Sequence, residues 1–260
     1  MKTASRSLGG IFWPLASLAA AVAAWHLVVA WFDLPSILLP GPLAVAKAAW
    51  RERTALAQGL SITAAASLAA FAVCAAVGLA VAVAFSQSRR LRRAVFPYVV
   101  FLQTVPIVAI APLLIIWSGS NFRTVVLVAV IIGLFPVVSN STSGLTAIPP
   151  LHADLFRVYR ASRWETLLWL RLPSAMPAWS LGLRISSGLV VIGAIVGEFF
   201  VGSAGSYRGL GTLITNWQAR QYTPGLVAAV FATSLLGLIF FGLAKLIGVV
   251  AVGRWTRGRL

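Results

Sequence analysis

Long apolar runs without a charged residue are the feature that most restricts the fold of this chain. The stretch 11–32 has 22 residues with no Lys, Arg, Asp or Glu, and the stretches 59–85 and 124–147 are also free of charge. An α-helix of about 20 residues crosses the ~30 Å hydrocarbon core of a bilayer. Only 10% of the 260 residues are charged, whereas a soluble domain has about 25%. The sequence therefore predicts a polytopic membrane protein.

The apolar runs predict an all-α fold with about six transmembrane helices. Between the first two runs, residues 33–58 have apolar side chains at helical spacing and basic ones off that stripe, which predicts an amphipathic helix on the membrane surface. Residues 202–223 are rich in Gly, Tyr and Trp, and predict an external loop with an interfacial helix. The predicted spans are 11–32, 59–85, 94–117, 124–147, 177–201 and 226–252.

Basic residues outnumber acidic ones, with 21 Lys and Arg against 5 Asp and Glu. They sit in short clusters between the apolar runs rather than in one patch, so we expect a membrane orientation signal and no nucleic acid. With six spans, the segments on the side of the N-terminus hold 13 Lys and Arg, and the opposite loops hold 6. Both termini are therefore predicted to be cytoplasmic. We expect three parts, namely 1–58, a five-helix core at 59–253, and a basic tail at 254–260.

Several enzyme classes are excluded because their residues are missing. No Gly-Lys pair occurs, so the chain has no Walker A phosphate loop. His26 and His152 cannot form a His-Glu-x-x-His zinc site, and no Gly-x-Ser-x-Gly elbow occurs. Cys74 stands alone in an Ala/Val-rich run and is expected to be a small buried residue. We expect no catalytic site, no bound cofactor and no metal in this chain.

Two predicted spans carry polar residues that lipid disfavours. The span 94–117 contains Gln-Thr-Val-Pro, so its helix is either broken and facing a cavity or merely kinked. In the span 124–147, the Asn140 amide cannot be fully satisfied by the preceding turn, which favours a water-lined pathway or a helix interface. The candidates for a pathway lining are Gln103, Thr104, Ser139, Asn140 and Thr142.

Glu198 is the only acid within or bordering a span after the first loop. A carboxylate at such a position is a candidate for a role in the pathway. The alternative is an interfacial carboxylate at the outer edge of the membrane. On the same span, Gly193 and Gly197 form a Gly-x-x-x-Gly pattern, which predicts a close-packing helix face.

The charged stretch 149–177, PPLHADLFRVYRASRWETLLWLRLPSAMP, interrupts the apolar runs. Pro149-Pro150 predicts a helix start, because proline at the first helical position gives up only an amide that is unpaired anyway. Ser162-Arg163-Trp164-Glu165 has the form of a capping box. A second helix is therefore expected from residue 163 to about Leu172, where Pro173 ends it.

The two predicted helices meet near Arg160-Ala161 and carry both basic and apolar side chains. Such a compact helix pair fits a groove on another protein. The alternative is an amphipathic loop that rests on anionic lipid. The basic residues are Arg157, Arg160 and Arg163, and the apolar residues expected to pack are Leu155, Phe156, Trp164, Leu167 and Leu168.

Several short motifs in this part of the chain occur together. They are Gln103-Thr104-Val105-Pro106, Arg160-Ala161-Ser162-Arg163-Trp164-Glu165, Leu172-Pro173-Ser174-Ala175-Met176-Pro177, Gly182-Leu183-Arg184 and Gly209-Leu210-Gly211. The combination resembles permeases of ABC importers with their EAA cytoplasmic loop. It is most similar to the nitrate/sulfonate/taurine branch, which includes transporters for thiamine-pyrimidine precursors and riboflavin-like compounds.

This resemblance implies a type I importer permease in the bacterial inner membrane, surrounded by lipid. Two copies would form the solute pathway, a cytoplasmic ATP-binding subunit would hydrolyse ATP with Mg²⁺, and an extracytoplasmic binding protein would deliver a small organic or oxyanion solute. The alternative is a self-sufficient secondary transporter or channel, for which Glu198 and His26 would be the ionisable relay. The coupling residues implied are Asp154, Arg157, Arg160, Ala161, Ser162, Arg163, Trp164 and Glu165.

The chain departs from the family pattern at two places. It has Asp154-Leu155-Phe156 where the family has Glu-Ala-Ala, and Arg160 where the family has a loop glycine. Glycine takes a left-handed backbone conformation without steric cost. Either Arg160 adopts that conformation with strain, or the turn has another shape.

Overall fold

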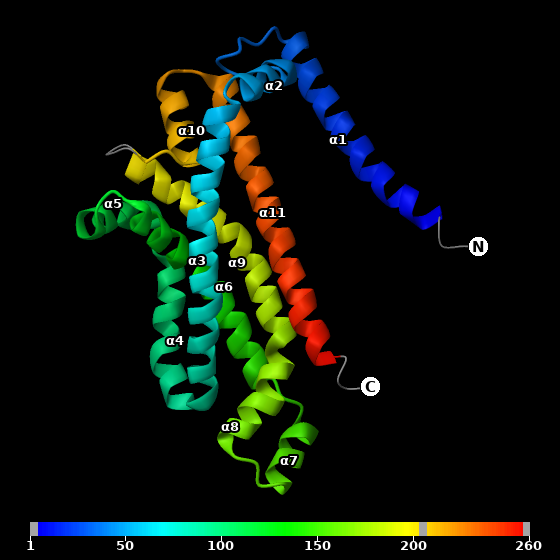
Figure 1. The fold of residues 1–260 in the computed structure, drawn as a ribbon, viewed down its shortest axis with the longest axis vertical. Coiled ribbons are helices and arrows are strands. Elements are labelled where there is room, and N and C mark those ends of the chain that lie inside the picture. Colours follow the sequence, from blue (N-terminus) through cyan, green and yellow to red (C-terminus); the bar gives the residue numbers. More distant parts are fainter. Residues whose placement is uncertain (1–4, 203–206, 257–260) are drawn as a thin grey trace. The chain divides into compact units, whose positions relative to one another are not determined.

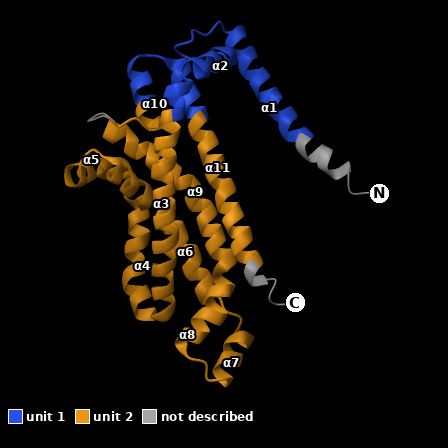
Figure 2. Cartoon of the chain, viewed as in Figure 1, with its two compact units in different colours: residues 1–57, 213–231 blue, residues 58–212, 232–260 orange. Residues whose placement is uncertain are grey.

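The structure is a computed structural model that describes residues 5–202 and 207–256. The described residues form helices and loops, and they divide into two compact units (Figure 2). Unit 1 comprises residues 1–57 and 213–231, and unit 2 comprises 58–212 and 232–260. Lys2, Gly205 and the last four residues of the predicted basic tail lie outside the described residues. The predicted division into 1–58, 59–253 and 254–260 stays a prediction.

Unit 1 contains the first apolar helix, α1 (Ser5–Trp31), and the short helix α2 (Pro42–Arg51). Pro42 stands at the start of α2, where its missing amide costs no hydrogen bond. α2 confirms the predicted helix between the first two apolar runs. The Thr223 hydroxyl donates to the Ile37 carbonyl at 2.8 Å, and this bond ties the start of α11 (Thr223–Thr256) to the loop before α2.

The centre of unit 2 is an antiparallel pair of helices, α6 (Phe122–Thr146) and α9 (Leu172–Val201) (Figure 1). Glycines let the two backbones approach closely. A Cβ on Gly193 would lie 2.6 Å from Ala129 Cα, and one on Gly197 would lie 3.1 Å from Val125 Cα. The predicted close-packing face of residues 193–197 is therefore confirmed.

Helix α3 (Arg53–Gln87) packs one face against this pair and leaves the other exposed. Gly78 abuts Val137 of α6, and the ring of Phe71 meets Phe240 of α11 edge to face at 6.3 Å. Cys74 is fully buried, as expected of a small core residue. The small residues of α3 occupy the buried face, where a larger side chain would hold the helices apart.

The predicted span 94–117 is broken into two helices, α4 (Arg89–Thr104) and α5 (Ile107–Ser118), bent by 101°. Val105 is extended because the ring of the following proline disfavours the helical conformation there. Pro106 then caps the start of α5. Of the two alternatives for this span, the structure shows the broken helix and not the kinked one. The described residues contain five long apolar helices, or six spans when this pair counts as one.

The predicted helix end at Pro173 is wrong. Residues 163–201 form one continuous helical run of 39 residues through α8 (Arg163–Thr166), η1 (Leu167–Arg171) and α9. η1 is a turn of π-helix, in which the Leu172 amide bonds to the Leu167 carbonyl five residues back. The wider turn separates the proline ring from the backbone it would meet in a regular α-helix. The helix that contains the predicted span 177–201 therefore begins well before residue 177.

Candidate functional site

The 149–177 loop forms one end of unit 2 (Figure 1). Its first helix, α7 (Pro150–Val158), starts at the proline pair as predicted. Its second helix, α8, begins at Arg163 and leads without interruption into the membrane helix α9. The loop and α9 therefore share one continuous helical backbone.

A Schellman motif ends α7. The Ala161 amide donates to the Phe156 carbonyl at 2.9 Å, and the Arg160 amide donates to the Arg157 carbonyl at 3.0 Å. This motif needs a left-handed residue after the helix cap, and Arg160 supplies it with φ of 49°. Of the two alternatives raised by the missing glycine, the structure shows the strained one. An L-residue pays about 1–2 kcal/mol for this conformation.

The predicted capping box starts the second helix. The Ser162 hydroxyl accepts from the Glu165 amide at 3.2 Å, and the Glu165 carboxylate accepts from the Ser162 amide at 2.7 Å. Together with the Schellman motif, it defines the backbone on both sides of Ala161. The turn between the two helices is thus held by local hydrogen bonds.

The charged side chains of the loop divide into paired and unpaired groups. Asp154 and Arg157 form an ion pair of 2.9 Å on the exposed face of α7. Arg160 and Arg163 are exposed and form no ion pair within the described residues. Ala161 is half-buried and lines a cavity of about 250 Å³ between the two helices of the loop.

The apolar side chains of the loop are more exposed than predicted. Leu167 is buried and Phe156 is half-buried, but Leu155, Trp164 and Leu168 are exposed rather than packed. Leu155 is exposed because α7 buries none of its residues against the rest of the described chain. The large apolar side chains exposed on the loop are Leu151 at 79%, Leu155 at 51%, Val158 at 79%, Tyr159 at 77%, Trp164 at 70%, Leu168 at 50% and Trp169 at 67%.

The predicted pathway residues do not gather in one place. Gln103 and Thr104 are exposed at the end of α4, and the Thr104 hydroxyl donates to the Phe101 carbonyl. Ser139 and Asn140 are half-buried on α6, which also contains the buried Thr142. Five well-formed cavities of the described residues are lined by other side chains.

Asn140 lies at a helix interface, one of the two surroundings expected for it. Its amide donates to the Pro136 carbonyl at 2.8 Å, and its Cβ lies 3.3 Å from the position of a Cβ on Gly182 of α9. The Thr142 hydroxyl donates to the Val138 carbonyl at 2.6 Å in the same manner. Both side chains thus satisfy hydrogen-bonding groups within their own helix.

Glu198 is fully buried inside unit 2. Its carboxylate accepts hydrogen bonds from the Thr63 hydroxyl, at 2.9 and 3.0 Å, and from the Gly211 amide at 2.8 Å. Thr63 also accepts from the Leu210 amide at 2.9 Å. This network joins α3 and α9 to the first turn of α10 (Leu210–Ala219).

Sequence reasoning missed Thr63, because nothing in its local sequence distinguishes it from other threonines in helices. Gly209 packs directly on the Glu198 carboxylate, where any side chain would overlap it. Tyr207 lies beside the same group, and its hydroxyl makes no hydrogen bond of normal geometry within the described residues. Burial and the Glu198 charge raise the pKa of the Tyr207 hydroxyl above its usual range.

Comparison with known proteins places the chain in a family. Residues 75–248 match the family described as binding-protein-dependent transport system inner membrane component. The chain is 31% identical to a probable ABC transporter permease protein of Haemophilus influenzae, over 88% of this chain and 91% of that protein. It is also 31% identical to the riboflavin transport system permease protein RibX of Chloroflexus aurantiacus, over 96% and 94%.

A third relative is the formylaminopyrimidine transport permease protein ThiX of Halalkalibacterium halodurans. This chain and ThiX are 33% identical over 65% of this chain and 66% of ThiX. The family match contains the broken α4–α5 pair, the 149–177 loop and Glu198. The chain belongs to the binding-protein-dependent transport system inner membrane components, and it is a multi-pass permease subunit of an ABC transporter.

Proposed function

We propose that this permease subunit couples solute import to a separate ATP-binding subunit through the 149–177 loop. The supporting observation is the exposed apolar surface of the loop, formed by Leu151, Leu155 and Val158 on α7, Tyr159 directly after it, and Trp164 on α8. Leu151, Leu155 and Val158 are spaced four and three residues apart, so they share one helix face. An amphipathic helix of this kind fits an apolar groove on a protein partner.

The residues of the loop would have two roles: some would stabilise the shape of the loop and others would contact the partner. The pairs Asp154–Arg157 and Ser162–Glu165 use their polar groups within the loop, and so stabilise its shape. Arg160, Arg163 and Trp164 are exposed and remain available to a partner. Because aromatic and arginine side chains dominate binding energy at protein interfaces, Trp164 with Arg163 would carry much of the affinity.

ATP binding and hydrolysis by the partner would move the docked loop, and α9 would pass that motion to the membrane-spanning core. Two copies of the chain would enclose the pathway, and an extracytoplasmic binding protein would supply the solute. The names of RibX and ThiX support a small heteroaromatic solute. A sulfonate-like or nitrate-like oxyanion is the second candidate, because the resemblance of the sequence motifs includes that branch and another relative is named for aliphatic sulfonates.

The docking role is tested by co-purification of the ATP-binding subunit with Arg163→Glu/Trp164→Ala. The matched control is Arg123→Glu/Trp117→Ala, an exposed arginine and tryptophan near the opposite end of α6. Normal membrane insertion of both variants, with loss of the ATP-binding subunit only from the first, is the expected result. Unchanged co-purification with the first variant would contradict the docking role.

A self-sufficient secondary transporter is the rival function, and reconstitution separates the two. The purified permease alone, in liposomes with an ion gradient, is expected to move no solute. Transport should require the ATP-binding subunit, ATP and the binding protein together. Gradient-driven uptake by the permease alone would refute the proposed function.

A further inference from the structure

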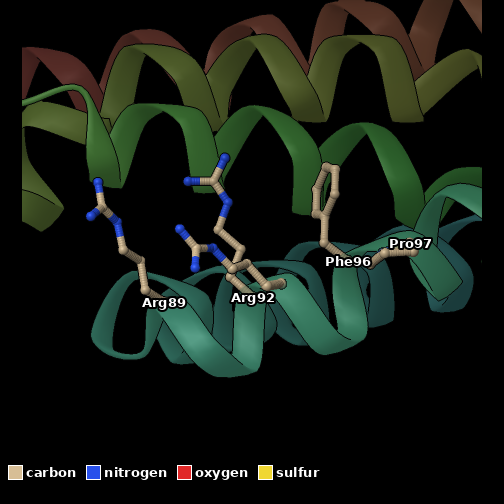
Figure 3. Close-up of a pocket in the computed structure, with 5 residues that line it drawn as sticks. Arg89, Arg92, Phe96 and Pro97 are labelled. Carbon is tan, nitrogen blue, oxygen red and sulfur yellow. The ribbon is translucent and has the colours of Figure 1, made fainter.

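Three arginines from two helices meet at the end of unit 2 that carries the 149–177 loop. Arg89 and Arg92 belong to the start of α4, and Arg171 is the last residue of η1. They line a cavity of about 380 Å³ whose other walls come from α3 and the end of α6. Figure 3 shows the side chains of Arg89 and Arg92 extending from α4 toward α6. We call these three residues the arginine pocket.

No carboxylate balances the arginine pocket. Unit 2 contains three acidic residues, and each is engaged elsewhere: Asp154 with Arg157, Glu165 in the capping box, and Glu198 with Thr63 and Gly211. The described residues give Arg89 and Arg92 no ion pair. Uncompensated arginines that converge on a cavity from separate helices are suited to an anionic ligand.

Arg171 is only partly satisfied by the protein. One end of its guanidinium donates to the Ser86 carbonyl at 2.6 Å, and this bond fixes the side chain against α3. Its Nε is buried and has no partner among the described residues. Within the described part of the chain, Arg171 therefore lines this cavity without a carboxylate partner.

A second cavity, of about 270 Å³, shares Arg89 and Arg92, is also lined by Arg93, and has an apolar wall of Phe96 and Pro97. The Arg92 guanidinium lies 5.9 Å from the centre of the Phe96 ring, so it stands at the boundary between the two cavities. A free phosphate ion would use only the charged side. A molecule with a phosphate head and a hydrocarbon tail would use both.

We propose that the arginine pocket binds the phosphate of an anionic phospholipid, with an acyl chain along Phe96 and Pro97. Guanidinium groups bind phosphate oxygens through paired, charge-assisted hydrogen bonds. Basic pockets between membrane helices bind anionic headgroups in this way. The site would link the starts of α4 and α9, and it is independent of whether the 149–177 loop docks on an ATP-binding subunit.

Native mass spectrometry of the full-length protein in neutral detergent tests the site, with phosphatidylglycerol as the probe. Arg92→Gln is the test variant, and Arg90→Gln is its control, because Arg90 is on the same helix, carries the same charge and lines neither cavity. Loss of a charge-assisted hydrogen bond lowers affinity by about tenfold or more. We therefore expect phosphatidylglycerol to bind to the protein. Arg92→Gln should weaken this binding, and Arg90→Gln should leave it unchanged. Arg89→Gln should repeat the loss in case Arg92→Gln folds poorly.

Three results would overturn the inference. Equal binding of phosphatidylcholine would show that the negative charge of the lipid is not recognised. Equal weakening by Arg90→Gln would reduce the effect to general surface charge. Displacement of phosphatidylglycerol by an equal concentration of inorganic phosphate would identify a simple anion site without use of the apolar wall.

Discussion

The Glu198 carboxylate accepts a 2.9 Å hydrogen bond from the hydroxyl of Thr63, which lies 135 positions away in the chain. Thr63 in turn accepts from the Leu210 amide, and the Gly211 amide donates to Glu198. One buried carboxylate therefore organises the amides at the start of α10 as well as the contact between α3 and α9. The arrangement makes Glu198 a structural centre of unit 2, whatever its part in solute transport.

Glu198→Ala should lower the free energy of unfolding by about 2–5 kcal/mol, because it leaves the Thr63 hydroxyl and the Gly211 amide buried without an acceptor. Thermal unfolding of the purified protein in detergent measures the loss. Glu165→Ala removes an exposed carboxylate of the capping box and should have a smaller effect. A melting temperature for Glu198→Ala equal to that of Glu165→Ala would argue against this network.

Gly209→Ala tests the packing on the same carboxylate. The added Cβ would overlap the Glu198 carboxyl group, so we expect a loss of about 1–3 kcal/mol. Gly237→Ala in α11 is the control, because its Cβ would meet no atom within 4 Å. That control should be neutral or gain up to about 1 kcal/mol, since alanine favours a helix over glycine. If Gly209→Ala and Gly237→Ala have the same melting temperature, Gly209 is not in tight contact with Glu198.

The glycines of α9 allow a matched test of the α6–α9 contact. Gly193→Ala places a Cβ 2.6 Å from Ala129 Cα and should destabilise the protein by about 1–3 kcal/mol. Gly188→Ala lies on the same helix with open space around its Cβ, and should be neutral or slightly stabilising. Chemical unfolding in mixed micelles reports the difference. Equal stability of the two variants would refute close packing at Gly193.

Arg160→Gly should stabilise the 149–177 loop by about 1 kcal/mol, because glycine adopts the left-handed conformation of the Schellman motif without steric cost. Slower amide hydrogen exchange at residues 160 and 161, whose amides bond to α7 carbonyls, would report the gain. Arg163→Gly, at the first residue of α8, should instead speed exchange in that helix. Faster exchange at residues 160 and 161 in Arg160→Gly would contradict the turn geometry.

Features that depend on neighbouring residues were predictable from the sequence by itself. The apolar runs predicted the membrane helices, Pro149-Pro150 and Ser162–Glu165 predicted both helix starts of the loop, and the prolines predicted either a break or a kink after α4. Each of these follows from hydrogen bonds or hydrophobicity within one short segment. The sequence also showed that glycine is missing at position 160. It therefore predicted either a strained left-handed Arg160 or a turn of another shape.

Only the tertiary structure decided which distant residues meet. The π-turn allows the helix to continue through Pro173. Leu155 of α7 is exposed because it does not pack against the rest of the described chain. Glu198 is buried by residues from other segments, among them Thr63. Arg171 is likewise brought to the same cavity as Arg89 and Arg92, although it lies 79 positions after Arg92 in the sequence. The physical reason is that contacts between helices depend on how the whole chain is threaded and packed. Local propensity and periodicity determine where each helix lies in the sequence and which of its faces is apolar, and they carry no information on what that face meets.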